Sequence, residues 1–192
     1  MRKLVLRVFD YSLDGVLAEE DTPFFDFCRA LPDDPGLEAW HRESLAGAGL
    51  HIMGRRTYEG MAQFYSSADA SDHPYAAVMS AAPKAVFSNM LASADWANTT
   101  VIRGDTSEQL GKLKQEGDGY ILAHGGVSFV QSLVRLGLVD EYNLTIFPYV
   151  AGTGASLFAE APEPQPLKLV TWSGFGNGMV GLIYRRSAMA EG

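Results

Sequence analysis

Strand-like segments alternate with amphipathic, helix-like segments through the first 137 residues, and only strand-like segments follow. The first group of strand-like segments covers residues 3–11, 50–53, 84–87, 100–102 and 120–123. The second group covers residues 142–149, 167–173 and 179–186, and a glycine-rich turn at 174–178 predicts that the last two form a hairpin. This order predicts an α/β fold with a largely parallel sheet, helices that cover it, and antiparallel strands at the C-terminal end.

Capping and turn residues place the predicted helices. Asp34 before Pro35 is a favourable helix start, and this helix is expected to end near Gly47–Gly49. Thr106-Ser-Glu-Gln109 has the pattern of a capping box and predicts another start. Further helices are expected over residues 54–64 and 127–136, and a loop over residues 65–73.

Composition narrows the class of protein. Hydrophobic residues make up 47% of the 192 residues, so we expect one domain, 1–192, with a full core. The net charge of -8 argues against a nucleic-acid partner, and an anionic ligand would need a local cluster of positive charge. No apolar stretch reaches the length of a membrane span, and Arg7 and Asp10 interrupt the N-terminal apolar run too early for a signal peptide. We therefore expect a cytoplasmic protein that does not bind membranes.

No metal site is expected. The one cysteine, Cys28, cannot form an internal disulfide or a cysteine-based zinc site. The four histidines have no metal-ligand spacing, which favours structural or solvated roles for them.

Three strand ends carry glycine or polar residues where open α/β sheets bind their ligands. The first is Gly54-Arg55-Arg56-Thr57, where a helix N-terminus, two guanidinium groups and a hydroxyl could hold a phosphate. The alternative is two solvated arginines at a helix start. The second is His124-Gly125-Gly126-Val127-Ser128, where paired glycines would allow a pyrophosphate close to the backbone, or form only a tight connection. The third is Ser88-Asn89. Because the three occupy equivalent places in successive strand–helix units, we expect them along one edge of the sheet.

The arginines at the first of these turns favour one cofactor over another. The glycine fingerprint of common dinucleotide-binding folds, G-x-G-x-x-G, does not follow the first strand, and a P-loop is also absent from the sequence. A site selective for NAD tends to use an acidic residue at the ribose hydroxyls, whereas arginines suit a 2′-phosphate. We therefore predict NADPH as the cofactor.

The sequence resembles the dihydrofolate reductase-like superfamily, and especially the reductase domain at the C-terminus of RibD, the bifunctional riboflavin-pathway deaminase-reductase. The matching segments are Ser12-Leu-Asp-Gly15, Met53-Gly-Arg-Arg-Thr-Tyr-Glu59, Val86-Phe-Ser88, Gly125-Gly126, Leu136-Gly-Leu-Val-Asp-Glu141, Phe147-Pro148 and Gly152-Thr-Gly-Ala-Ser-Leu-Phe158. The resemblance covers nearly the whole chain. It implies a three-layer fold with helices on both faces of a sheet of about eight strands, and NADPH laid across the strand ends.

The resemblance also implies roles for individual residues. Arg55, Arg56 and Thr57 would hold adenosine-side phosphates, and Ser88 would lie beside the 2′-phosphate. Gly54 would provide the turn into the phosphate-binding helix. Gly125, Gly126, Val127 and Ser128 would take the pyrophosphate. The loop from Ser12 to Val16, with Gly15, would close over the nicotinamide.

Two acidic residues are candidates for catalysis. Asp14 lies in the loop nearest the nicotinamide and could orient substrate or cofactor, or serve only as an Asp-Gly turn residue. An ungapped count back from Gly54 places Glu38 where folate reductases carry a carboxylate, which could bond a pteridine amide and relay a proton. The alternative for Glu38 is a surface glutamate near a helix N-terminus.

The resemblance implies hydride transfer from NADPH to a pyrimidine- or pteridine-like heterocycle. The nearest activity is that of 5-amino-6-(5-phosphoribosylamino)uracil reductase. However, riboflavin-pathway reductases typically carry lysine where this chain has Val16, and a chain with one cysteine cannot supply the His/Cys/Cys zinc ligands of the deaminase half. The alternatives are a dihydrofolate reductase-type enzyme and a protein that binds NADP(H) without catalysis. The late antiparallel strands also offer a surface for a homodimer.

Overall fold

A computed structural model of the chain describes residues 1–67, 70 and 72–187. Its strands are β1 (Leu4–Ser12), β2 (Ala48–Gly54), β3 (Lys84–Phe87), β4 (Thr99–Ile102), β5 (Tyr120–Ala123), β6 (Glu141–Phe147), β7 (Leu167–Gly174) and β8 (Val180–Arg186). Its helices are α1 (Pro23–Ala30), α2 (Pro35–Ala46), α3 (Arg55–Tyr65), α4 (Ala76–Ala81), α5 (Thr106–Leu113) and α6 (Val127–Arg135). Of the expected loop over 65–73, residues 68, 69 and 71 lie outside the described residues.

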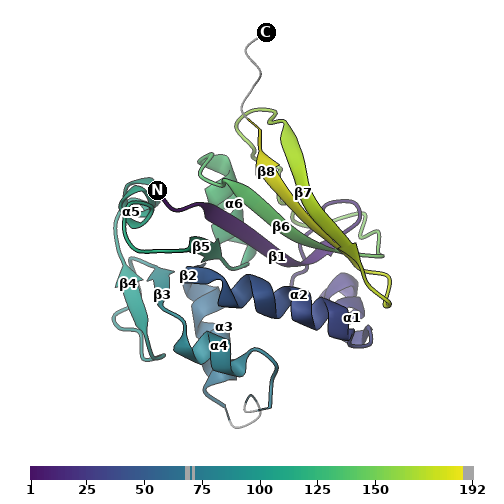
Figure 1. Cartoon of the computed structure of the whole chain (residues 1–192), viewed down its shortest axis with the longest axis horizontal. Helices are drawn as coiled ribbons and strands as arrows, with labels where there is room; N and C mark the ends of the chain where they lie inside the picture. Colours follow the sequence, from purple (N-terminus) through teal and green to yellow (C-terminus); the bar gives the residue numbers. More distant parts are fainter. Residues whose placement is uncertain (68–69, 71, 188–192) are drawn as a thin grey trace.

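The strands form one eight-stranded sheet in the order β4-β3-β2-β5-β1-β6-β8-β7. The neighbours from β4 to β6 are all parallel, whereas β8 is antiparallel to both β6 and β7. The β7–β8 hairpin lies at one end of the sheet and β4 at the other (Figure 1). The predicted mostly parallel sheet with antiparallel C-terminal strands is therefore confirmed.

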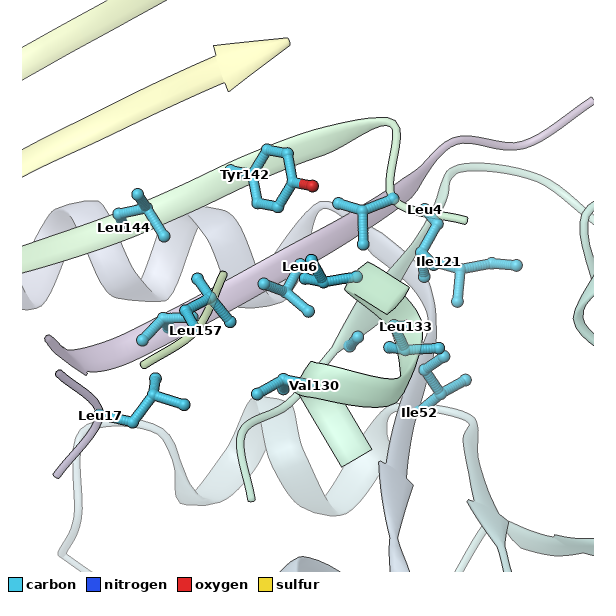
Figure 2. Close-up of a cluster of buried hydrophobic side chains, with 14 of the residues drawn as sticks. Leu4, Leu6, Leu17, Ile52, Ile121, Val130, Leu133, Tyr142, Leu144 and Leu157 are labelled. Atoms are coloured by element: carbon cyan, nitrogen blue, oxygen red, sulfur yellow. The ribbon is translucent and has the colours of Figure 1, made fainter. Parts of the chain in front are cut away.

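Helices cover both faces of this sheet. On one face, Leu4 and Leu6 of β1 pack with Val130 and Leu133 of α6 (Figure 2). These residues and Leu110 of α5 belong to the largest cluster of buried side chains. The alternate residues of β1, β2 and β5 face the other way and pack against α2, α3 and α4. The period of two along each strand thus divides the core into the two outer layers that a three-layer fold requires.

Local signals explain most helix boundaries. The Asp34 side chain caps α2 by accepting from the Leu37 N–H at 2.8 Å, as predicted. The predicted capping box is wrong by one residue, because Asp105 caps α5 by accepting from the Glu108 N–H. Helix α1 was not predicted, although Thr22 caps it and Pro23 occupies its first turn, which is the same signature as at Asp34-Pro35. Helix α4 was also not predicted; it has six residues and no side-chain cap.

A layer of buried polar side chains lies on the α2 face of the sheet. It comprises Arg7, His41, His51, Lys84, His124, Asn143 and Thr145. The Lys84 ammonium donates to the carbonyls of Met79 and Ala82 and lies 4.4 Å from the centre of the Trp96 ring. A cation that is hydrogen-bonded in this way fixes α4 and the segment after it against β3.

Candidate functional site

The three strand ends selected from the sequence lie along one edge of the sheet. Gly54, the last residue of β2, pairs with Phe87, which immediately precedes Ser88. On the other side of β2, Ile52 pairs with Ala123, which immediately precedes His124. Because β3, β2 and β5 are adjacent and parallel, their carboxyl ends open in the same direction. The expectation that these turns share an edge is confirmed.

Gly54 has a different role from a sharp turn. Its φ is -80°, which any residue adopts, so the turn into α3 does not need a glycine for its backbone angles. A side chain at position 54 would instead bring its Cβ to 3.1 Å from Cβ of Phe129 on α6. Glycine at this position therefore allows α6 to approach β2 and keeps the starts of α3 and α6 close together.

A hydrogen bond joins the two glycine-containing turns. The Thr57 hydroxyl, in the first turn of α3, donates to the carbonyl of Gly125 at 2.6 Å. Gly126 begins α6 with φ +101°, a conformation for which side chains are poorly suited, and a Cβ there would overlap the Thr57 hydroxyl. Helices α3 and α6 both begin at a glycine with no side-chain cap, so their first N–H groups are left for an anion or for water.

A cavity of about 560 Å³ opens beside these two turns. Its walls come from the end of β1, the segment after it, α1, α3, the residues leading into α4, and the turn from His124 to Val127. Its aromatic wall residues are Phe9, Phe25, Phe64, Tyr65 and Tyr75. Size and lining are typical of a site for a small organic ligand with a planar ring.

The cavity brings together about half of the predicted cofactor residues. Arg56, Thr57, Gly125, Gly126 and Val127 line it. The predicted residues outside its lining are Gly15, Gly54, Arg55, Ser88 and Ser128. Arg55 pairs with Glu59 one turn along α3, at 2.9 Å. The Ser88 hydroxyl accepts from the N–H groups of Met90 and Leu91, which fixes the turn that follows β3.

Asp14 holds a loop in place and does not line the cavity. Its carboxylate accepts from the Ser12 hydroxyl and from the N–H groups of Ala151 and Gly152. These hydrogen bonds lower the pKa of Asp14 to about 2, so it is ionised at neutral pH. The Ser12–Val16 loop is thereby tied to the segment that follows β6, and Gly15, with φ +86°, completes the turn.

Glu38 also lies away from the cavity. It is in the first turn of α2, where it is half-buried on the helix surface and pairs with Arg42. The structure therefore does not place a carboxylate of α2 in the cavity. A glutamate near a helix N-terminus was the alternative interpretation, and its surroundings agree with that alternative.

Several cavity residues were missed in the sequence. Arg7 and Asp10 of β1 line the cavity, as does Arg29 of α1. His124, which the sequence predicts in the second turn, directly follows β5 and also lines it. Arg29 donates to the Asp10 carboxylate at 2.8 Å, and burial raises the pKa of Asp10 despite this pairing. A signal was present, because Arg7 and Asp10 interrupt an otherwise apolar strand, and charges in a buried strand need a partner or a ligand.

The buried histidines are neutral and form three polar contacts at and beside the cavity. His51 Nδ1 lies 2.7 Å from His124 Nε2, and burial lowers the pKa of His51 to about 4 and that of His124 well below its ordinary value. His41 contacts the guanidinium of Arg7 through Nδ1 and the Thr145 hydroxyl through Nε2. Burial and the nearby Arg7 lower the pKa of His41 to about 2. Within residues 1–67, 70 and 72–187 no cluster of His, Cys, Asp and Glu could hold a metal ion.

Comparisons with known proteins agree with this architecture. The RibD C-terminal domain family matches residues 3–181. The uncharacterized protein YwjB of Bacillus subtilis (strain 168) is 26% identical over 93% of this chain and 95% of its own length. A second uncharacterized protein from that organism, YyaP, is 36% identical over 43% of this chain; the matched segment spans 44% of YyaP. In the described part of the chain no helix is long and apolar enough to cross a membrane.

Solved structures share the fold at low identity. A protein of Shewanella sp. PV-4 whose name refers to riboflavin biosynthesis has a TM-score of 0.73 and 22% identity, over 97% of this chain and 99% of that one. Dihydrofolate reductase from Enterococcus faecalis, complexed with NADP(H) and RAB-propyl, has a TM-score of 0.63 and 16% identity, over 97% of each chain. RibD from Acinetobacter baumannii has a TM-score of 0.63 and 16% identity, over 97% of this chain but 58% of that protein. With its dihydrofolate reductase-like fold and a match over nearly all of its length, the chain belongs to the RibD C-terminal domain family.

Proposed function

We propose that this protein is an NADPH-dependent reductase that transfers a hydride to a pyrimidine- or pteridine-like heterocycle. The nearest activity is that of 5-amino-6-(5-phosphoribosylamino)uracil reductase. The observation that carries the proposal is the pair of uncapped helix starts at Gly54 and Gly126, joined by Thr57 beside a cavity with an aromatic lining. An Enterococcus faecalis protein with the same fold was solved with NADP(H).

The residues around the two turns fit a dinucleotide phosphate. Free N–H groups at the starts of α3 and α6 provide donors and positive dipole ends, and Arg56 adds an exposed positive charge at the cavity wall. When bound, the cofactor would supply the hydride. The chain's own residues would orient it along the strand ends, stack a planar substrate ring against the aromatic wall, and exclude water from the space between them.

Replacing Arg55 and Arg56 together by Ala is expected to weaken NADPH binding about 100-fold and NADH binding much less. Two charge-assisted contacts to a 2′-phosphate are worth roughly that factor, and NADH lacks this group. Dissociation constants for NADPH and NADH, measured by fluorescence titration of the double variant and the unaltered protein, test this difference. Arg42→Ala, which removes an arginine that pairs with Glu38 away from the cavity, is the matched control. Equal weakening of NADPH and NADH would contradict the assignment.

Asp10 is the carboxyl group that we propose for proton delivery to the reduced heterocycle. It lines the cavity, and burial raises its pKa above the ordinary value of a carboxyl, which is the direction that a proton donor requires. Asp10→Asn is expected to lower the rate of NADPH oxidation about 100-fold with little change in NADPH affinity. Steady-state rates over pH 5–8 check this. Asp26→Asn, which alters an exposed carboxylate of α1 outside the cavity lining, separates proton delivery from a general loss of negative charge.

One assay distinguishes the proposed reductase from the two alternatives. A folate-type reductase is supported only by the shared fold, since Glu38 lies outside the cavity lining. NADPH oxidation measured with dihydrofolate and with a ribosylaminopyrimidine would assign the substrate class. Tight NADPH binding with no oxidation by either compound would favour a binding protein without catalysis.

We also propose a homodimer built on β7. This strand is at the end of the sheet and exposes Leu169, Val170 and Trp172, the last with 65% of its surface accessible. An edge strand with exposed apolar side chains is a ready site for pairing with a second copy. Trp172→Glu is expected to shift the protein from dimer to monomer in sedimentation equilibrium. Met90→Glu, which changes an apolar residue with 83% of its surface accessible and outside the cavity lining, should leave the dimer intact.

A further inference from the structure

Arg7 is a buried cation that lines the cavity and has no carboxylate partner in the described part of the chain. It lies in the middle of β1 with 9% of its surface exposed, between the apolar residues Leu6 and Val8. Burial lowers its pKa to about 10, so the guanidinium still carries its charge at neutral pH. A charge in such a position ordinarily needs a compensating group.

The hydrogen bonds of Arg7 leave most of its donors unused. Among residues 1–67, 70 and 72–187, one terminal nitrogen contacts His41 Nδ1 at 2.5 Å, and this is the side chain's only hydrogen bond. His41 is neutral and cannot balance the charge. The other guanidinium nitrogens lack a partner among the described residues, yet they are not fully buried. Because Arg7 lines the cavity, the space open to these nitrogens is the cavity. A guanidinium has five N–H donors in a planar fork, so several remain available there.

Neighbouring charges compensate Arg7 only in part, since Asp10 attracts the guanidinium without forming a salt bridge with it. Asp10 also lines the cavity, but its carboxylate forms a salt bridge with Arg29. The charged residues of the lining are Arg7, Arg29 and Arg56 against Asp10 and Glu20, an excess of positive charge in a chain whose net charge is -8. Phe9 lies against the guanidinium, with 5.1 Å between Arg7 Cζ and the ring centre, and limits its movement. The cavity thus combines a fixed, unpaired cation with aromatic walls.

We propose that Arg7 determines substrate specificity by pairing with a planar oxyanion, a carboxylate or an ionised ring oxygen, carried by the heterocyclic substrate. The planar fork of a guanidinium matches two coplanar oxygens, and pairing in a site with few competing waters is strong. A neutral heterocycle would leave the buried charge without a partner and would bind less well. The inference rests on the proposed function in treating this cavity as the substrate site.

Binding of matched anionic and neutral heterocycles tests the role of Arg7. The probes are orotate, which is uracil-6-carboxylate, with 6-methyluracil, and pterin-6-carboxylate with 6-methylpterin. Isothermal titration calorimetry on the full chain without cofactor gives the dissociation constants. We expect at least one carboxylate to bind about thirtyfold or more tightly than its methyl counterpart, and Arg7→Met to abolish this preference. Arg29→Met, which removes a lining arginine already paired with Asp10, is expected to keep the preference.

Several outcomes would overturn the inference. It fails if neither carboxylate is preferred in the unaltered protein, or if Arg7→Met and Arg29→Met reduce the preference equally. Thermal melting, monitored by circular dichroism, verifies that the variants fold. If Arg7→Met does not fold, Arg7→Gln, which preserves a polar contact to His41, replaces it. Because no NADPH is present, these results are independent of the proposed reductase activity. A chain that prefers the carboxylate through Arg7 but never oxidises NADPH would retain the inference and refute the proposed function.

Discussion

Gly126→Ala is expected to destabilise the protein by about 3 kcal/mol and to remove measurable NADPH binding. A side chain at φ +101° strains the backbone by about 1–3 kcal/mol, and its Cβ would displace the Thr57 hydroxyl. Loss of the hydrogen bond from Thr57 to Gly125 adds about 1 kcal/mol. The starts of α3 and α6 would then separate, and both contribute N–H groups to the proposed phosphate site.

The adjacent glycine supplies a matched control. A Cβ on Gly125 would meet no protein atom within 4 Å, so Gly125→Ala is expected to change the unfolding free energy by less than about 0.5 kcal/mol. Urea unfolding of both variants and NADPH titration of the folded proteins distinguish the two positions. Equal stability of Gly126→Ala and Gly125→Ala would contradict the role given to the Thr57 contact. Weaker NADPH binding by a stable Gly125→Ala variant would support close approach of the cofactor to this turn.

Acidification from pH 6 to pH 5 is expected to cost the protein about 3–4 kcal/mol of stability through its buried histidines. His41, His51 and His124 have folded-state pKa values below their ordinary value of 6.5, to about 2 for His41 and about 4 for His51. The unfolded chain therefore binds protons that the folded chain does not. Stability falls as pH drops below about 6.5, by roughly 1 kcal/mol per histidine between pH 6 and pH 5.

Urea unfolding at the two pH values measures this loss directly. His41→Gln removes one of the three titrating groups, so its loss of stability between pH 6 and pH 5 should fall to about two thirds of that of the unaltered chain. The comparison concerns the pH dependence and not the starting stability, which the substitution also changes. An unchanged pH dependence in His41→Gln would show that His41 titrates in the folded protein much as it does in the unfolded chain.

Sequence patterns predicted the sheet and the glycine-containing turns at its strand ends, because both depend on residues that are close together in the sequence. The Asp34-Pro35 helix start and the β7–β8 hairpin follow from local capping and turn chemistry, and the edge shared by Gly54, Ser88 and Gly125 follows from parallel topology. Helix α1 carried an equally good local signal at Thr22-Pro23 that was overlooked. Helix α4 has no cap, and its buried Met79 indicates that tertiary packing decides its position.

The interior of the site required the tertiary structure. Arg7 lies in β1 and His124 directly follows β5, and the pairing of these two strands, which are far apart in sequence, brings both residues to one cavity. Whether the Arg7 side chain would be covered by a helix or would face a cavity depends on which helices pack on each face of the sheet. No local sequence pattern contains that information. Likewise, the ungapped count that selected Glu38 could not detect that this residue would lie on the outer surface of α2.

The central strand of this sheet is the first to be synthesised and among the last to acquire partners. Its neighbours β5 and β6 begin at Tyr120 and Glu141. The Leu4 N–H donates a hydrogen bond to the carboxylate of Asp140, which lies 136 residues later in the chain. On the ribosome the apolar β1 segment must therefore remain without its sheet partners until residues 120–147 have been synthesised. Contacts this distant in sequence slow folding, and an exposed apolar strand is a target for chaperones and for aggregation. Truncated chains that end before β5 should accordingly be insoluble, because the segment that organises the fold would lack both of its partners.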